Sequence, residues 1–264
     1  MTLAPLDLTV AIATLADRVP PYDAGALPEC AGLRYIIVCQ GDTEGRGLVG
    51  PHRSDVRILE TTERGAARSR NTAMAACETP LLLFADDDMT FDPAGWAALR
   101  GMATQNADVD FYLARMRADD GTWRKAYGGE TPKRAVLRNT MKVGTPEIMI
   151  RVARFRAKSI AFDPSFGAGA RYPVGDEFAF LADAIRAGLT GWHVPVCVGT
   201  HAARSSGMVY DALQMNARIA LFRRVFGSCS FAVRIVFAIK HRARFPSRRA
   251  ALSFAFGRAS APRR

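Results

Sequence analysis

The sequence predicts an α/β protein with a mostly parallel central sheet flanked by helices, followed by a basic helical C-terminal extension. Short, almost continuously apolar runs alternate with helical segments through the first 200 residues. This alternation is typical of a parallel sheet covered on both faces. One apolar run ends directly in three aspartates, and beyond Asp211 the chain contains no acidic residue. The first feature suggests a site at a strand end, and the second separates the extension from the body.

The elements follow one another along the chain. Apolar and β-branched residues predict strands at Leu8–Ala13, Leu33–Cys39, Asp55–Leu59 and Leu81–Ala85, and another at Thr145–Ile150. Helical patterns are present at Gly65–Cys77, which Thr79-Pro80 ends, at Pro93–Met102 and at Phe178–Ile185. Glycines and a basic run make residues 117–150 the least regular part, and we expect a loop there that crosses the sheet.

Length and composition favour one large domain with an appendage, because 264 residues that are 49% hydrophobic can bury a sizeable core. Five dispersed cysteines form no CxxC pair, which suggests reduced thiols in the cytoplasm. The first 18 residues have no basic n-region and include Asp7, so we expect no signal peptide. No run of 18 apolar residues predicts a membrane span.

The positive charge of the chain lies in its C-terminal part. Twelve of the 36 Lys and Arg residues follow Asp211, which leaves 24 bases against 25 acids in residues 1–211. Basic and apolar residues without acids suit an anionic membrane surface. A nucleic-acid patch and a helical arm packed on the body are the competing interpretations. We expect a catalytic domain in residues 1–207, a basic amphipathic extension in residues 208–264, and a peripheral location at the cytoplasmic face of the membrane.

The stretch FADDDMTF places three carboxylates after the apolar run Leu81–Phe84. Adjacent carboxylates repel one another, and partial burial strengthens the repulsion. A solvated turn would explain one aspartate but not three between large apolar groups. A divalent cation explains all three, because Mg²⁺ and Mn²⁺ bind carboxylate oxygens and keep positions open for phosphate oxygens. The sequence therefore predicts a metal held against a phosphorylated ligand.

Three blocks of the sequence carry a family resemblance. The helix start GAARSRN precedes the strand that closes on Asp86-Asp87-Asp88, FDPSFG precedes the acidic pair Asp176-Glu177, and the strand VPVCVGT precedes His201. In this order they resemble family-2 glycosyltransferases, which have the nucleotide-diphospho-sugar transferase (GT-A) fold and a D-x-D motif. The resemblance covers roughly residues 8–207.

The resemblance implies an inverting, metal-dependent hexosyltransferase that moves a sugar from a nucleotide diphosphate, with UDP as the expected nucleotide, to an acceptor hydroxyl. It implies Mn²⁺ or Mg²⁺ as cofactor and a sugar or lipid-linked sugar as acceptor, in bacterial-type cell-surface polysaccharide or glycolipid synthesis. The implied metal ligands are Asp86, Asp88 and His201. The implied donor contacts are Thr14, Gln40, Arg70, Asn71, Asp86 and Asp87. Many members carry Asp near Gln40, so the nucleotide base stays open.

The acidic pair has two alignments with the family. Members usually have Glu-Asp, with the second acid as the base, whereas this chain has Asp-Glu. Alignment by position makes Glu177 the base and Asp176 its support, and alignment by side chain reverses these roles. We favour Glu177. Both residues would also suit the start of a helix, where acids are favourable.

Two other classes of protein remain open. A sugar-nucleotide nucleotidylyltransferase shares the α/β class and the metal, but it usually has a Gly-rich basic loop soon after the first strand, which LTVAIATLADRVPPYD lacks. A non-catalytic binder of sugar or nucleic acid would retain the basic tail without needing three aspartates. Trp96, Trp123 and Trp192 could line a sugar site, although core packing is the default for each.

Overall fold

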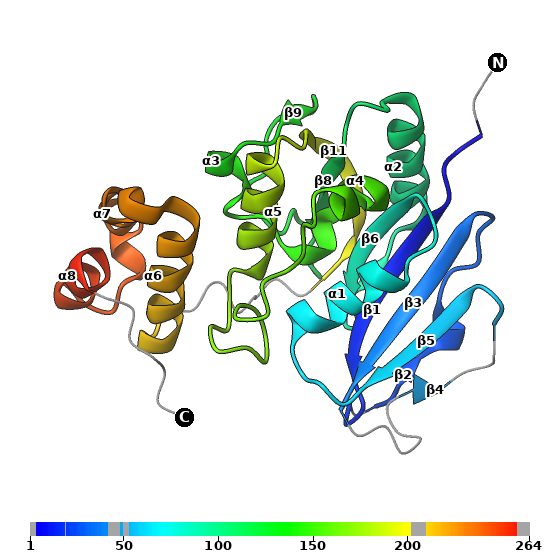
Figure 1. Cartoon of the computed structure of the whole chain (residues 1–264), viewed down its shortest axis with the longest axis horizontal. Coiled ribbons are helices and arrows are strands. Elements are labelled where there is room, and N and C mark those ends of the chain that lie inside the picture. Colours follow the sequence, from blue (N-terminus) through cyan, green and yellow to red (C-terminus); the bar gives the residue numbers. More distant parts are fainter. Residues whose placement is uncertain (1–3, 19, 42–47, 50–52, 202–209, 258–264) are drawn as a thin grey trace.

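The computed structural model describes residues 4–18, 20–41, 48–49, 53–201 and 210–257. Its main sheet has nine strands in the order β5-β3-β1-β6-β10-β8-β11-β7, with β9 paired to β11 (Figure 1). The strands are β1 (Leu8–Leu15), β3 (Leu33–Gln40), β5 (Val56–Thr61), β6 (Leu81–Asp86), β7 (Thr90–Phe91), β8 (Phe111–Arg117), β9 (Lys133–Arg134), β10 (Ile148–Arg151) and β11 (Gly191–Thr200). A parallel pair, β2 (Tyr22–Asp23) and β4 (Leu48–Val49), lies apart from it.

The strand directions place the carboxyl ends of several strands along one edge of the sheet. β5, β3, β1 and β6 pair in parallel, β10 is antiparallel to both β6 and β8, and β11 is parallel to β8. Because β10 opposes both neighbours, β6 and β8 run in the same direction. The carboxyl ends of β1, β3, β6, β8 and β11 therefore lie along a common edge, where ligands of open α/β sheets bind.

Helices cover both faces of the sheet, as the continuously apolar strands predict. The helices are α1 (Ala66–Ala76), α2 (Pro93–Gln105), α3 (Leu137–Thr140), α4 (Val152–Ala157), α5 (Asp176–Arg186), α6 (Ala212–Phe226), α7 (Ser230–Lys240) and α8 (Arg248–Phe256). One core contains residues of α1, α4 and α5, among them Met74, Phe155 and Phe180. The core on the other face contains Trp96 and Leu99 of α2.

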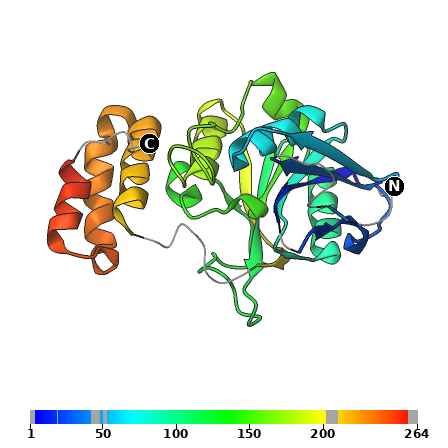
Figure 2. The same cartoon turned by 90° about the horizontal axis from the view of Figure 1, so that it is seen from below.

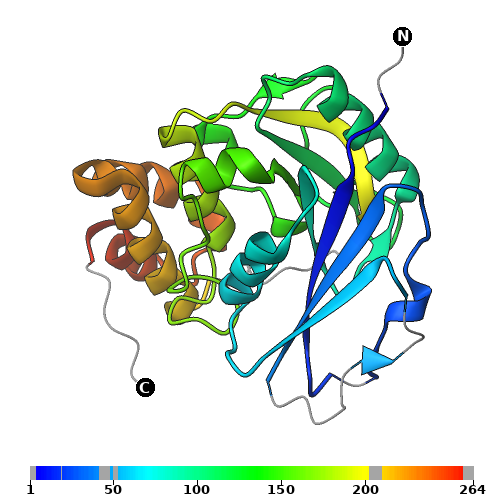
Figure 3. The same ribbon diagram turned by 45° about the vertical axis from the view of Figure 1, so that its right-hand side comes forward.

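The C-terminal helices form a third layer beside α5, on its side away from the sheet (Figures 1 and 3). Phe222 and Val225 of α6 are buried in one cluster with Phe178 of α5 and Phe254 of α8. Arg224 forms ion pairs with Asp163 at 2.7 Å and with Asp183 at 2.8 Å. The apolar face of α6 therefore packs against α5.

The predicted α/β class and mostly parallel sheet are confirmed, with local differences. The strand β8 lies within a segment that was not predicted to be a strand, and β10 begins at Ile148, after a short 3-10 turn at Thr145–Glu147. The expected domain boundary between residues 207 and 208 lies outside the described residues. Among the residues that the structure describes, no helix is long and apolar enough to cross a membrane.

Candidate active site

The predicted metal ligands lie together at the common edge. Asp86 ends β6, Asp88 follows in the turn, and His201 follows β11. One ligand atom from each lies within 4.8 Å of the other two. The Nε2 atom of His201 is 3.0 Å from Asp88 Oδ1 and 3.6 Å from Asp86 Oδ2. Two carboxylates and an imidazole are a donor set that suits Mn²⁺, and the carboxylates also suit Mg²⁺.

The charges of this cluster depend on one another. Hydrogen bonds to Asp86 and Asp88 raise the pKa of His201 to about 9, although burial and the charge of Arg124 oppose the shift. The hydrogen bond from His201 lowers the pKa of Asp88. Burial acts to raise the pKa of Asp86, but the His201 hydrogen bond and Arg70 outweigh it, so this pKa is lowered. A cation bound here would displace the proton that His201 holds.

Asp87 points to the β1 side of the cluster. Its Oδ2 accepts a hydrogen bond from Thr14 Oγ1 at 2.5 Å, and its Oδ1 lies 2.9 Å from Arg18 Nη1. Burial raises the pKa of Asp87, while Thr14 and Arg18 partly oppose the shift. The sequence analysis named Thr14 and Asp87 but missed Arg18. In the sequence, Arg18 is a single basic residue shortly after the first strand, and nothing there distinguishes it from an ordinary surface arginine.

Arg70 joins the aspartates of β6 to the acidic pair of α5. Its Nη2 lies 3.4 Å from Asp86 Oδ1, and its Nη1 donates to Asp176 Oδ2. The guanidinium also lies over the ring of Phe162, 5.6 Å from its centroid. Its side chain is 12% exposed, so the two carboxylates compensate a largely buried cation. We predicted a phosphate contact for Arg70; the structure gives it two carboxylate partners.

The acidic pair starts α5 behind two glycines that the backbone requires. Gly175 caps the helix with φ +97°, and a Cβ there would lie 2.3 Å from Leu221 of α6. Gly167 has φ +98°, and its Cβ would lie 2.8 Å from the Asp176 carboxyl carbon. Both conformations favour glycine. Close packing on these two glycines therefore fixes the position of the acidic pair.

The two acids have different surroundings. Asp176 is 4% exposed and is held by Arg70. Glu177 is only partly buried. Burial and the neighbouring Asp176 charge raise the pKa of Glu177 to about 8, although Arg70 acts in the opposite direction. A carboxyl group with a raised pKa beside a buried ion pair suits a general acid or base.

Gln40 and Asn71 use their side chains to hold the backbone. Gln40 is 5% exposed, and its Oε1 accepts a hydrogen bond from Gly65 N at 2.7 Å. Asn71 bonds the backbone of Phe162 in both directions, from Nδ2 to the carbonyl and from the amide to Oδ1, each at 2.8 Å. We predicted donor contacts for both residues. In the structure, Gln40 holds the start of α1, and Asn71 ties α1 to the FDPSFG block.

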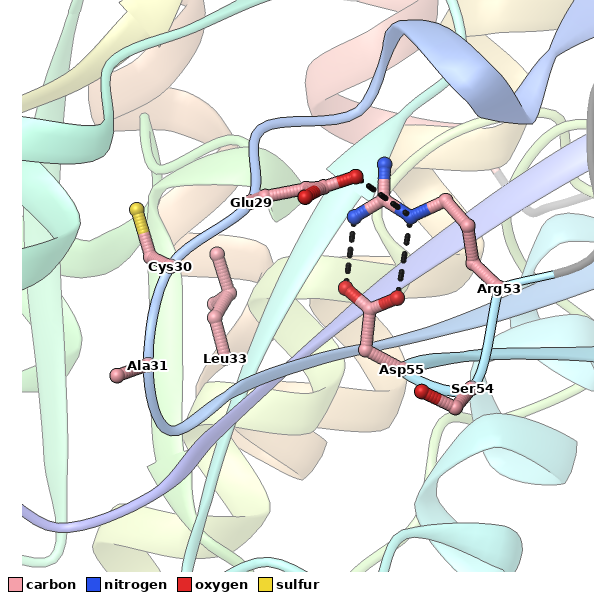
Figure 4. Close-up of a pocket in the computed structure, with 7 residues that line it drawn as sticks. All are labelled: Glu29, Cys30, Ala31, Leu33, Arg53, Ser54 and Asp55. Atoms are coloured by element: carbon pink, nitrogen blue, oxygen red, sulfur yellow. Dashed lines mark hydrogen bonds and ion pairs between the residues drawn. The ribbon is translucent and has the colours of Figure 1, made fainter.

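A depression of about 590 Å³ lies at the opposite edge of the sheet, near Leu33 at the start of β3. Figure 4 shows Arg53 there between Glu29 and Asp55. Its guanidinium forms two hydrogen bonds with Asp55 and donates to the carbonyl oxygen of Leu27. Both acids of this depression are ion-paired with Arg53, so the candidate active site is the edge that carries the aspartates.

A family model described as glycosyl transferase family 2 matches residues 46–209, which is more than half of the chain. The matched residues include the three aspartates, the acidic pair and His201. No curated protein sequence matches the chain.

Solved structures of S. aureus TarS have a similar fold. The chain matches residues 1–349 of TarS with a TM-score of 0.59 and 12% identity, over 96% of this chain and 73% of that one. It spans 44% of the longer TarS structure at the same score and identity. The same TarS segment in complex with UDP-GlcNAc matches with a TM-score of 0.56 and 14% identity, over 95% of this chain and 73% of that one.

Proposed function

The chain belongs to glycosyl transferase family 2 and is a glycosyltransferase of the GT-A fold that uses a nucleotide sugar, and from this premise we propose an inverting, metal-dependent transfer from a UDP-sugar to an acceptor hydroxyl. The observation that supports the proposal most is the convergence of two carboxylate clusters on Arg70. Structures of S. aureus TarS with UDP and with UDP-GlcNAc support the choice of UDP. Family membership removes the nucleotidylyltransferase and the non-catalytic binder from consideration.

We assign the donor to the β1 and β6 ends of the sheet edge. Asp86, Asp88 and His201 would hold Mn²⁺ or Mg²⁺, and Asp87, Thr14 and Arg18 would contact the nucleotide. A bound cation there supplies positive charge that neutralises the diphosphate leaving group. Gln40, Arg70 and Asn71 act on the donor indirectly in this proposal, because their polar atoms hold the loops and carboxylates that surround it.

We assign general-base catalysis to Glu177. Its carboxylate accepts the proton of the acceptor hydroxyl, the hydroxyl oxygen forms a bond to the anomeric carbon, and the bond from that carbon to the diphosphate breaks with its electron pair on the diphosphate. Attack from the face opposite the leaving group inverts the anomeric centre. A raised pKa makes Glu177 a stronger base than an ordinary carboxylate. Asp176 supports it by fixing Arg70.

The test is a panel of nucleotide sugars, incubated with Mn²⁺ and analysed for nucleotide diphosphate release. We expect one UDP-sugar to be hydrolysed faster than its GDP and TDP counterparts. When the sugar is transferred to an acceptor, nuclear magnetic resonance of the product should show the opposite anomeric configuration from the donor. Retention of the anomer would contradict the base assignment, and absence of release from every donor would contradict the activity.

We further propose that residues 1–207 form the catalytic domain and residues 208–264 a membrane-facing extension, through which the enzyme lies at the membrane that carries its acceptor. The outer sides of α7 and α8 expose apolar side chains that are 45–68% accessible: Phe231, Val236, Ile239, Leu252 and Phe256. Exposed bases lie near the end of α6, at the end of α7, in the turn that follows it and at the start of α8, namely Arg223, Lys240, Arg242, Arg244, Arg248 and Arg249. Such a surface suits anionic lipid, because aliphatic groups insert while bases meet headgroups.

The fold limits which of the C-terminal bases can contact a membrane. Arg218 and Arg234 are 8% and 6% exposed, and Arg224 is held by Asp163 and Asp183, so these three bases cannot all meet a bilayer. A deletion that begins inside α6 would expose the core beside α5 and is unsuitable as a test. The full chain should instead sediment with anionic vesicles and be released at high salt. Equal binding to neutral vesicles, or binding to DNA alone, would contradict the membrane assignment.

A further inference from the structure

Of the three tryptophans, only Trp123 has a large exposed surface. Trp96 is 1% exposed and donates its Nε1 hydrogen to the carbonyl oxygen of Val198. Trp192 packs at the edge of the α2-side core. Trp123 is 41% exposed. Core packing does not account for an aromatic side chain that is this exposed, so the contacts around it indicate whether it has a function.

Trp123 lies on a hairpin that continues from β8. Arg117 at the end of β8 forms a bridge with Trp123, and the return strand is held by a hydrogen bond from Arg124 N to Met116 O. A tight turn closes the hairpin at Gly121, whose φ is +80°. Figure 2 shows the green segment after β8 projecting from the body. The tryptophan is therefore carried by a regular, hydrogen-bonded element.

Two arginine side chains lie against the indole, the exposed Arg117 and the buried Arg115. Arg117 lies 4.4 Å from the ring centroid, and Arg115 lies 5.5 Å from it and 5.8 Å from the ring of Tyr127. Arg115 is only 5% exposed. Its Nη1 donates to Glu130 at 2.9 Å, and its Nη2 donates to the carbonyl oxygens of Gly128 and Gly129. Two arginines thus lie against an indole that keeps 41% of its surface exposed.

A second network fixes the neighbouring ring. Glu147 is 2% exposed, and it accepts hydrogen bonds from Tyr127 at 2.5 Å and from Lys125 at 3.0 Å. The Tyr127 ring meets that of Trp123 edge to face, with centroids 5.8 Å apart. A fully hydrogen-bonded buried network restricts the groups that it includes. The Tyr127 ring that packs against Trp123 is therefore held in place.

The position of Trp123 relates it to the site. The amide of His201 donates to the carbonyl oxygen of Arg117 at 3.0 Å, so His201, Arg117 and Trp123 lie side by side across three neighbouring chain segments. At the usual strand spacing, the backbone of Trp123 is about 10 Å from that of His201.

Strand alternation assigns the face. Phe111 and Leu113 of β8 belong to the core beneath α1 and α5, so Arg115 and Arg117 also point to that face. Trp123 shares the face because it is paired with Arg117. The helix α5, which begins with Asp176 and Glu177, covers the same face. The groups that contact Asp87 are Thr14 of β1 and Arg18, which follows β1. Within the sheet, β1 and β8 lie on opposite sides of β6.

We propose that Trp123 is a stacking platform for the sugar ring of the acceptor. A pyranose presents polarised C–H groups on one face, and these are attracted to the negative face of an indole. Stacking there would hold the acceptor on the side of the base, away from the nucleotide. The inference rests on the proposed transfer reaction, and it assigns to Trp123 a positioning role in acceptor binding.

The experiment uses the full chain with the best UDP-sugar, Mn²⁺ and the methyl glycosides of glucose, galactose, mannose and N-acetylglucosamine as probes. The variants are Trp123→Ala, Trp123→Phe and Ile58→Ala; the last is a control, because Ile58 is equally exposed but lies on β5. UDP release is measured against glycoside concentration, and glycoside binding in the presence of UDP is measured by saturation-transfer nuclear magnetic resonance. Thermal denaturation verifies that each variant is folded.

We expect at least one glycoside to raise UDP release by the unaltered chain. The half-saturating glycoside concentration should rise about 10-fold in Trp123→Ala, partly recover in Trp123→Phe and stay unchanged in Ile58→Ala. Equal values in the unaltered chain and Trp123→Ala would overturn the proposal, as would donor hydrolysis that no glycoside alters. If no donor is hydrolysed, the transfer reaction fails, whereas glycoside binding lost in Trp123→Ala would still support the platform.

Discussion

Replacing Arg70 with methionine tests how the two halves of the site are held together. Methionine retains an unbranched, apolar chain of similar length, but it removes the cation between Asp86 and Asp176. Asp176 is 4% exposed, so the substitution leaves its carboxylate buried without its partner. Asp86 keeps His201 within 3.6 Å, so its loss is smaller.

The expected cost follows from this burial. Breaking a buried ion pair from one side usually lowers the free energy of unfolding by about 3–5 kcal/mol. For a protein of this size, that corresponds to a fall in melting temperature of roughly 6–20 °C.

Urea denaturation followed by circular dichroism measures the free energies. The double variant Arg70→Met, Asp176→Asn is the matched comparison, because it removes the cation and its buried partner together. It should be about 2 kcal/mol more stable than Arg70→Met alone, since no unpaired charge remains. The reasoning is refuted if Arg70→Met stays within about 1 kcal/mol of the unaltered chain, or if the second substitution adds a further loss.

The remaining predictions concern the base, its titration and the membrane surface. Glu177→Gln should keep UDP binding by calorimetry but lower kcat by about 10²–10⁴-fold, with a smaller effect from Asp176→Asn; the reverse order would reassign the base. In the unaltered chain, kcat/KM should rise with pH towards a plateau above about 8, because only the deprotonated carboxylate accepts a proton, and a flat profile would exclude Glu177. Ile239→Glu places an acid on the exposed face of α7 and should weaken sedimentation with anionic vesicles by about 10-fold or more without changing the melting temperature, whereas Ile58→Glu should bind vesicles like the unaltered chain.

The parts of the fold that sequence predicts are those with a local signal. β1, β3 and β6 are continuous apolar runs, and their limits are predicted to within two residues. β8 was missed because it ends in Ala-Arg-Met-Arg, and the burial of Arg115 depends on distant carbonyl groups and on Glu130. No residue within or next to the strand indicates these partners of Arg115.

The same limit applies to the site. Asp86, Asp88 and His201 were brought together in advance by the family resemblance, and the structure places all three at the carboxyl ends of β6 and β11. The tasks of Gln40 and Asn71 could not be predicted, because they bond the backbone of Gly65 and Phe162, and Phe162 lies 91 positions from Asn71. The link from Arg70 to Asp176 likewise spans 106 positions. Which polar side chain faces a ligand and which holds a loop is decided by such long-range contacts.

The most direct test of the central claim is the metal dependence of UDP release by the unaltered chain and by Asp88→Ala, measured with the best UDP-sugar in Mn²⁺, after chelation, and after Mn²⁺ is restored. We predict that chelation abolishes release by the unaltered chain, that restored Mn²⁺ recovers it, and that Asp88→Ala is folded but inactive in all three conditions. Release that persists in chelator, or an Asp88→Ala variant that is active with Mn²⁺, would contradict a catalytic cation held by Asp86, Asp88 and His201.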